Sequence, residues 1–206
     1  VNGAGKTTTI KMLTGLVKPT CGEATVGGCS VITQPEKVKR LIGVSPQETA
    51  VAPKLSVKEN LELICGIHGF SKEKTRAKIG ELSEKFSLGT VLSEKAGKLS
   101  GGWQRRVSIA MALISEPEIL FLDEPTLGLD VIARHELWDI IRSLKGKATV
   151  VLTTHYMEEA EALSDRIGIM KNGRLCAVGT AQELRQKAGT DDFESAFVAI
   201  VREGEI

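Results

Sequence analysis

Four consecutive apolar residues, Ile119–Leu122, stand directly before Asp123-Glu124-Pro125. An unbroken apolar run of this length predicts a strand buried on both faces, the position typical of parallel sheets. A second apolar and β-branched run, Ala148–Thr153, predicts another buried strand, and helical patterns at His135–Leu144 and Tyr156–Leu163 follow the two strands. Strands that alternate with helices predict an α/β fold with a mostly parallel sheet.

The stretch from Pro53 to Ser115 carries helical patterns and no strand signal. Ser56 and Glu59 form a capping box that begins one helix, and Ser71 and Gly101 begin two more. We therefore expect residues 53–115 to form a helical lobe inserted into the α/β core. The patterns also predict a helix at Lys6–Leu13, short strands within Gly22–Val31 and at Leu41–Val44, a hairpin of Arg166–Met170 and Leu175–Val178 with Asn172-Gly173 as its turn, a helix capped by Thr180 and Glu183, and an amphipathic helix over Phe193–Val201.

Length and composition fit a single domain over residues 1–206, with room for a small lobe. Lys and Arg total 27 against 26 for Asp and Glu, a net charge of +1 that gives no sign of the basic face of a nucleic-acid-binding protein. The longest apolar runs are strand-sized, far short of the about 18 residues that a membrane-spanning helix needs. Four scattered cysteines without a C-x-x-C pair argue against zinc and disulfides and favour a cytoplasmic location.

The sequence starts inside a glycine-rich motif without an initiator Met, so we expect a fragment that lacks the first glycine of the motif and the strands before it. The glycines let backbone N–H groups converge on phosphate oxygens, and the helix that follows points its positive dipole end at the same anion. In this motif the lysine reaches the β- and γ-phosphates and the next hydroxyl binds Mg²⁺. The predicted phosphate-binding residues are Asn2, Gly3, Ala4, Gly5, Lys6, Thr7 and Thr8.

Asp123 and Glu124 follow the predicted buried strand at the edge where ligands bind in open α/β sheets. An aspartate there can hold Mg²⁺, usually through water. The adjacent glutamate points toward the γ-phosphate side and can polarise an attacking water. An isolated Asp-Glu pair is usually a solvated strand end, but the apolar run before this pair and Pro125 after it favour a ligand role.

Ser100, Gly101 and Gly102 stand at the start of a long helix and form a second anion site. One ATP carries one set of phosphates, so the simplest explanation is that this second site serves the nucleotide of a partner chain. The arginines that follow, Arg105 and Arg106, are expected on a solvated or partner-facing edge.

These segments together resemble the nucleotide-binding domain of ABC transporters, which implies a P-loop NTPase core. Residues 2–8 resemble Walker A, residues 119–124 Walker B, and Leu99–Gly102 the ABC signature. Gln47 falls at the Q-loop, Thr126–Asp130 resembles the D-loop, and His155 resembles the switch histidine. Six motifs in the family's order span nearly the whole chain, which is far more specific than any one of them.

The resemblance implies an ATPase with ATP and Mg²⁺ bound between two subunits arranged head to tail. It assigns Glu124 as the general base, His155 as the group that orients the γ-phosphate and water, and Gln47 as a contact to Mg²⁺ and water. The metal ligands would be Thr7, Gln47 and Asp123. Asp130 would face the nucleotide site from the D-loop and cap the helix that follows it.

Within the family, the segment that follows His155, the Trp-Gln-Arg-Arg after the glycine pair and the closing helix are similar to ATPase subunits of ABC-2 antibiotic-resistance exporters. This branch implies a second ATPase subunit, most simply an identical one, and a separate membrane permease that holds the chain on the inner face of the membrane. A soluble ABC ATPase acting in translation or on DNA remains the alternative, and a non-hydrolysing switch is a third reading. Lys6, Asp123, Glu124 and His155 argue against the third.

Overall fold

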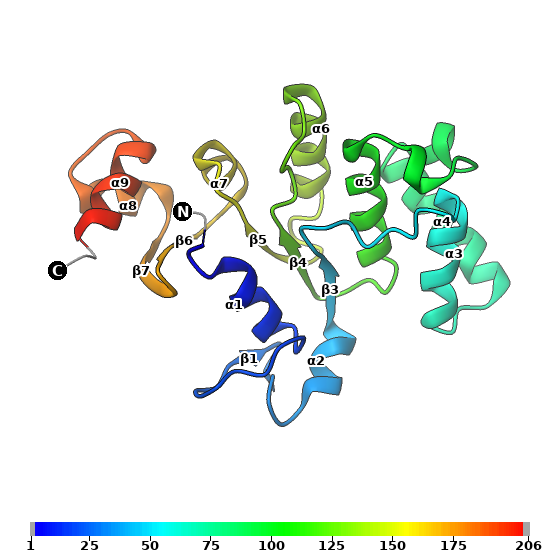
Figure 1. Cartoon of the computed structure of the whole chain (residues 1–206), viewed down its shortest axis with the longest axis horizontal. Helices are drawn as coiled ribbons and strands as arrows, with labels where there is room; N and C mark the ends of the chain where they lie inside the picture. Colours follow the sequence, from blue (N-terminus) through cyan, green and yellow to red (C-terminus); the bar gives the residue numbers. More distant parts are fainter. Residues whose placement is uncertain (1–2, 204–206) are drawn as a thin grey trace.

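The computed structural model describes residues 3–203, in which a small parallel sheet lies between helices at the centre of the molecule (Figure 1). In chain order the elements are α1 (Lys6–Leu13), β1 (Thr25–Val26), β2 (Cys29–Ser30), α2 (Pro35–Leu41), β3 (Ile42–Ser45), α3 (Val57–Ile67), α4 (Lys72–Lys85), the 3₁₀ turns η1 (Leu88–Val91) and η2 (Ala96–Lys98), α5 (Gly101–Ala112), β4 (Ile119–Asp123), α6 (Val131–Arg142), β5 (Thr149–Thr153), α7 (Met157–Leu163), β6 (Ile167–Lys171), β7 (Arg174–Gly179), α8 (Ala181–Ala188) and α9 (Phe193–Glu203).

The central sheet runs in the order β3-β4-β5, and both pairings are parallel. Its register places Ser45 opposite Leu122 and Asp123 opposite Thr153. The carboxyl ends of the three strands therefore meet at one edge, where open α/β sheets bind their ligands. The predicted α/β fold with a parallel sheet is confirmed.

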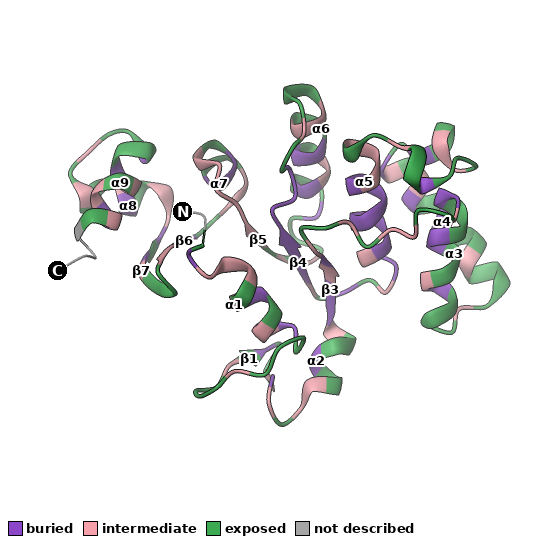
Figure 2. Ribbon diagram, in the orientation of Figure 1, coloured by how far each residue is buried: buried purple, intermediate pink, exposed green. Residues whose placement is uncertain are grey.

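Strand β4 is buried on both faces, as its apolar run predicts (Figure 2). Leu120 and Leu122 join the hydrophobic cluster built by helices α3 to α6. Phe121 points to the other face and joins the cluster that contains Ile10 of α1 and Val38 of α2. Helices α1 and α5 therefore cover opposite faces of the sheet.

The chain between β3 and β4 is helical, as expected, and begins helix α3 with the predicted capping box of Ser56 and Glu59. Ser71 caps α4 in the same way, because its side chain accepts from the backbone N–H of Lys74. Helices α3, α4 and α5 gather at one end of the molecule (Figure 1). Their shared hydrophobic cluster continues to Leu120 of β4, so these helices and the sheet are packed around one core.

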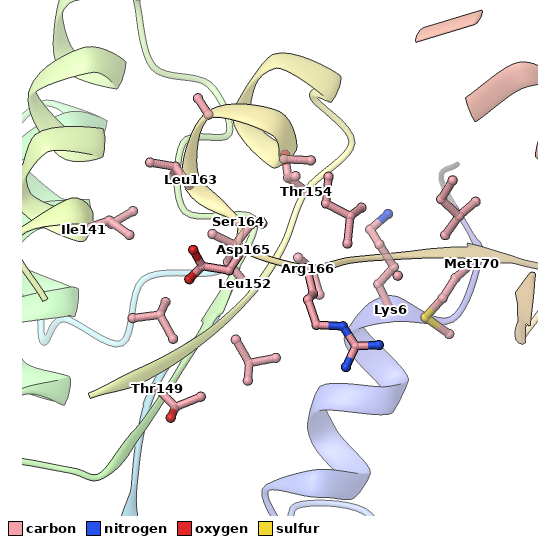
Figure 3. Close-up of a pocket in the computed structure, with 18 of the residues that line it drawn as sticks. Lys6, Ile141, Thr149, Leu152, Thr154, Leu163, Ser164, Asp165, Arg166 and Met170 are labelled. Atoms are coloured by element: carbon pink, nitrogen blue, oxygen red, sulfur yellow. The ribbon is translucent and has the colours of Figure 1, made fainter. Parts of the chain in front are cut away.

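Strand β5 differs from the prediction, because it is half-buried to exposed along its length. Val151 in its middle is 36% exposed. Among residues 3–203, β5 pairs only with β4, and its other edge borders a cavity of about 920 Å³. Figure 3 shows Thr149 and Leu152 of β5 on one side of this cavity and Arg166 and Met170 on the other.

The last third of the described chain forms a third hydrophobic cluster, in which α8 and α9 cover the hairpin of β6 and β7. The predicted turn is confirmed, with Asn172 at φ 49° and Gly173 at φ 77°, the left-handed pair of a two-residue hairpin. Thr180 and Glu183 form the predicted capping box at α8. No helix within residues 3–203 has both the length and the apolar character to cross a membrane.

Candidate functional site

The phosphate loop leads directly into α1, and Gly5 precedes the helix with φ 95°. Within residues 3–203 no side chain caps this helix start, so the described chain leaves its first backbone N–H groups available to an anion. The loop is supported from the hairpin turn, because the N–H of Gly173 donates to the carbonyl of Ala4 at 2.9 Å. Gly3 and Thr8 are exposed beside the same helix start, and Asn2 lies outside the described residues.

Asp123, at the end of β4, gathers hydroxyl groups around its buried carboxylate. The Thr7 hydroxyl of α1 donates to Asp123 Oδ1 at 3.2 Å. The Thr153 hydroxyl, level with Asp123 on β5, donates to the same oxygen. Carboxylate and hydroxyl oxygens are hard donors, and Mg²⁺ typically takes one or two of them together with waters. Thr7 and Asp123 therefore fit a magnesium ion.

Glu124 contacts two of the other predicted site residues. Its Oε1 lies 3.5 Å from Lys6 Nζ, and its Oε2 is hydrogen-bonded to His155 Nδ1 at 2.7 Å. The side chain is nearly buried, and the backbone stands at φ 49°, a left-handed conformation that costs a non-glycine residue about 1–3 kcal/mol. Its backbone N–H donates to the carbonyl of Thr153 at 3.1 Å, which holds this conformation in place. The fold therefore aims the Glu124 carboxylate between the phosphate loop and His155.

Gln47 follows β3, two residues beyond Ser45, at the same edge of the sheet as Glu124. Its side chain is exposed, and within residues 3–203 it makes no hydrogen bond to Thr7 or Asp123. The backbone of Gln47 is held, because its carbonyl accepts from Arg105 at 2.5 Å. The structure places Gln47 at the correct edge without bringing its side chain to the other metal-ligand candidates.

Ser100, Gly101 and Gly102 begin α5, on the face of the sheet opposite to α1. Ser100 is the N-cap, but its side chain makes no capping hydrogen bond. Asp130 does cap its helix, since Oδ1 accepts from the N–H of Ala133 at 2.9 Å. The structure therefore keeps this second anion site apart from the phosphate loop of the same chain.

The expectation of a solvated edge at Arg105 and Arg106 is wrong, because the two residues are only 5% and 9% exposed. Arg105 reaches back to the segment after β3, and Arg106 pairs with Glu136 of α6. Burial lowers the pKa of the Arg105 guanidinium, and the charge of Asp123 opposes that shift. Burial on α5 runs without a break from Arg105 to Met111, because the helix packs against α3, α6 and β3, so a helical period alone did not indicate the burial of Arg105.

The sequence was compared with known families and proteins. A family model described as ABC transporter matches residues 1–127. The chain belongs to the ABC transporter family. It is 44% identical over 194 residues to a daunorubicin resistance ATP-binding protein of Streptomyces coeruleorubidus, which covers 94% of the chain and 61% of that protein. It is 45% identical over 190 residues to a doxorubicin resistance ATP-binding protein of Mycobacterium tuberculosis, with 91% and 57% covered. The chain thus spans about three-fifths of the length of these relatives.

Solved ABC structures have the same fold. An ATP-binding subunit of an ABC transporter superposes with a TM-score of 0.85 at 32% identity, covering 97% of this chain and 85% of that one. A dimeric ATP-binding cassette, bound to ADP and phosphate in a post-hydrolysis state, superposes with a TM-score of 0.78 at 30% identity, covering 87% and 82%. The ABC ATPase fold is therefore shown along nearly the whole chain.

Proposed function

We propose that this chain is the ATP-binding and ATP-hydrolysing part of an ABC exporter. The observation that carries the proposal is the cluster at the carboxyl edge of the sheet. There Glu124 lies between Lys6 of the phosphate loop and His155, and Asp123 lies beside Thr7. Each of these contacts joins residues far apart in the sequence, and together they supply an anion site, a hard-cation site and a candidate base.

In the proposed reaction, the start of α1 and Lys6 bind the phosphates of ATP. Thr7 and Asp123 would hold Mg²⁺, which would supply positive charge to offset that of the phosphates. Glu124 accepts a proton from the water that attacks the γ-phosphate, and the products are ADP and phosphate. His155, whose Nδ1 is bonded to Glu124, orients the γ-phosphate and that water. Gln47 contributes to the metal and the water from the end of β3.

We propose that two such chains, most simply identical, assemble head to tail around two ATP molecules. Ser100 to Gly102 of one chain would then face the phosphate loop of the other, with Asp130 beside it. A Cβ added at Gly101 would meet nothing within 4 Å, so nothing near it in the chain excludes a side chain there. Because glycine in a helix costs about 1 kcal/mol, an approaching partner is a reason for its presence. The dimeric solved structure supports this arrangement.

The exporter assignment is supported by the relatives whose names state resistance to daunorubicin and doxorubicin. It implies a separate permease and a place on the inner face of the membrane through that permease. The net charge of +1 gives no support to the alternative of an ATPase acting on nucleic acid.

We also propose residues 1–206 as one ABC domain, with residues 53–115 as its helical lobe. Within residues 3–203, the cavity beside β5 has an unpaired strand edge and apolar walls, including Ile10 of α1, Ile167 of β6 and Phe197 of α9.

The test is Mg-ATP turnover by the full-length protein beside its Glu124→Gln variant, with nucleotide binding measured separately. We expect the variant to bind ATP and to lose at least about a hundredfold in turnover, the contribution typical of a general base. Glu158→Gln is the matched control, because Glu158 is exposed on α7, the helix after His155, and within residues 3–203 it makes no hydrogen bond or ion pair with a site residue. Turnover that survives in Glu124→Gln would remove Glu124 from the proposed role.

A further inference from the structure

Arg105 makes two contacts that the proposed mechanism does not use. Its Nη1 donates to the carbonyl of Pro46 at 2.6 Å, and its Nη2 donates to the carbonyl of Gln47 at 2.5 Å. The residue is 5% exposed and lies on the second turn of α5. A buried guanidinium therefore donates hydrogen bonds to two successive backbone carbonyls just after β3.

Two further polar contacts join α5 to the same segment. The hydroxyls of Ser45 and Ser108 are hydrogen-bonded at 2.9 Å in a buried position. The Thr49 hydroxyl lies 3.5 Å from the side-chain oxygen of Gln104, a weaker contact. The segment from Ser45 to Thr49 is thus fastened along one face of α5, with Arg105 as its central contact.

The chemistry of these contacts is specific to arginine. The planar guanidinium presents two parallel N–H donors in a fixed fork, which matches two carbonyls one residue apart. A lysine ammonium keeps the charge but has no such fork, so it cannot hold both carbonyls in the same relative orientation. Since Gln47 has an exposed side chain, its direction depends on how firmly this backbone is held.

We propose that Arg105 is a positioning residue, which holds the backbone of Pro46 and Gln47 against α5 and so fixes the point from which the Gln47 side chain reaches the nucleotide site. The proposal rests on the proposed function, because Gln47 acts there only if the chain hydrolyses ATP. It adds a physical link, since α5 begins with Ser100 to Gly102, the segment assigned to the nucleotide of the partner chain. A shift of α5 would then shift Gln47 with it.

The first test needs no nucleotide and uses backbone NMR relaxation of the full-length protein. In Arg105→Lys we expect the order parameters of the amides of residues 47–50 to fall toward those of a flexible segment, below about 0.6, while those in the centre of α5 stay near about 0.85. The matched control is Arg106→Lys, on the same helix and similarly buried but bonded to Glu136. Unchanged order parameters at residues 47–50 in Arg105→Lys would overturn the proposal.

The second test asks whether Arg105 acts through Gln47. We expect Arg105→Lys to lower kcat about tenfold to a hundredfold, with the KM for ATP nearly unchanged, because misplacing a contacting group slows the reaction more than it weakens binding. In a Gln47→Ala background the same substitution should lower kcat no further, whereas Arg106→Lys should have the same effect in both backgrounds. Losses from Arg105→Lys and Gln47→Ala that multiply would overturn the proposal. Wild-type protein that binds ATP without hydrolysing it would instead contradict the proposed function, and the NMR order parameters would still decide the role of Arg105.

Discussion

Replacement of Trp138 by phenylalanine tests a buried polar contact between α6 and α7. The indole N–H of Trp138 donates to Glu159 Oε1 at 3.0 Å. Glu159 is fully buried, and its other carboxyl oxygen has no hydrogen-bond partner within the described part of the chain. Trp138→Phe therefore leaves a buried carboxyl group without its only donor, which costs about 1–3 kcal/mol. The smaller ring adds about 1 kcal/mol of lost apolar burial.

We expect Trp138→Phe to lower the free energy of unfolding by about 2–4 kcal/mol, or roughly 4–16 °C in Tm for a chain of this size. Removing the carboxyl group should reverse part of this loss, because two apolar partners leave nothing unsatisfied. In a Glu159→Met background the indole N–H is already unpaired, so Trp138→Phe also removes that penalty and should cost at most the about 1 kcal/mol of apolar burial. Urea denaturation followed by circular dichroism measures both values without depending on tryptophan fluorescence.

The control is Glu158→Met, which changes an exposed neighbour on the same helix and should leave the cost of Trp138→Phe unaltered. An equal cost of Trp138→Phe in the wild-type and Glu159→Met backgrounds would refute the reasoning. It would show that the indole acts by packing alone.

Two further predictions concern the helical lobe. Lys78, buried in α4, donates to Glu116 at 2.5 Å, and this hydrogen bond lowers the pKa of Glu116. The stability that this hydrogen bond supplies is present above about pH 4.3, the pKa of Glu116 in the unfolded chain, and it is lost as the pH falls through the lower pKa of the folded state. Lys78→Met should therefore make the free energy of unfolding less dependent on pH in the acid range. Replacement of the exposed Lys72 by methionine is the control and should leave that dependence unchanged. Ser56→Ala removes an N-cap acceptor and half of the capping box with Glu59, and should lower the free energy of unfolding in urea by about 1 kcal/mol.

Patterns with a local physical cause predicted most of the fold. The capping boxes at Ser56 and Thr180 and the turn at Asn172 are in place because each depends on residues within four positions of one another. The sequence patterns do not predict helix α2, although Pro35 at its first turn followed by Glu36 is a helix-start signal. They predict a strand over Leu41–Val44, one residue before the observed start of β3 at Ile42.

The burial of β5 was predicted wrongly for a different reason. Its apolar, β-branched residues indicate a strand with two neighbours, while only β4 pairs with it in the described chain. The apolar pattern of a strand indicates how much of its surface is suited to burial, whereas the neighbouring strands and helices determine how much of that surface is buried. The same limit applies to Arg105, because no sequence pattern indicates that α5 is buried on several sides or which distant carbonyls the guanidinium bonds.

The candidate site was predictable as a set of residues but not as a set of contacts. Lys6, Asp123, Glu124 and His155 each stand in a recognisable motif, and the structure brings them together through the register of β4 and β5. Thr153 and Gly173 support the site and stand in none of the motifs, since their roles follow only from that register and from the packing of the β6–β7 turn.

Buried polar contacts connect the two halves of the proposed ATP site within each chain. Arg105 joins the helix that begins with the signature residues to Gln47, and Trp138 with Glu159 joins the helix capped by Asp130 to the helix that follows His155. Hydrogen bonds are directional, so they fix the relative position of two helices more narrowly than apolar packing does. In each case a segment that we assign to the nucleotide bound by the partner chain is hydrogen-bonded to the segment that carries a residue assigned to the nucleotide of the same chain. Closure of a head-to-tail dimer would therefore displace both together, and the two substitutions Arg105→Lys and Trp138→Phe interrupt the two connections separately.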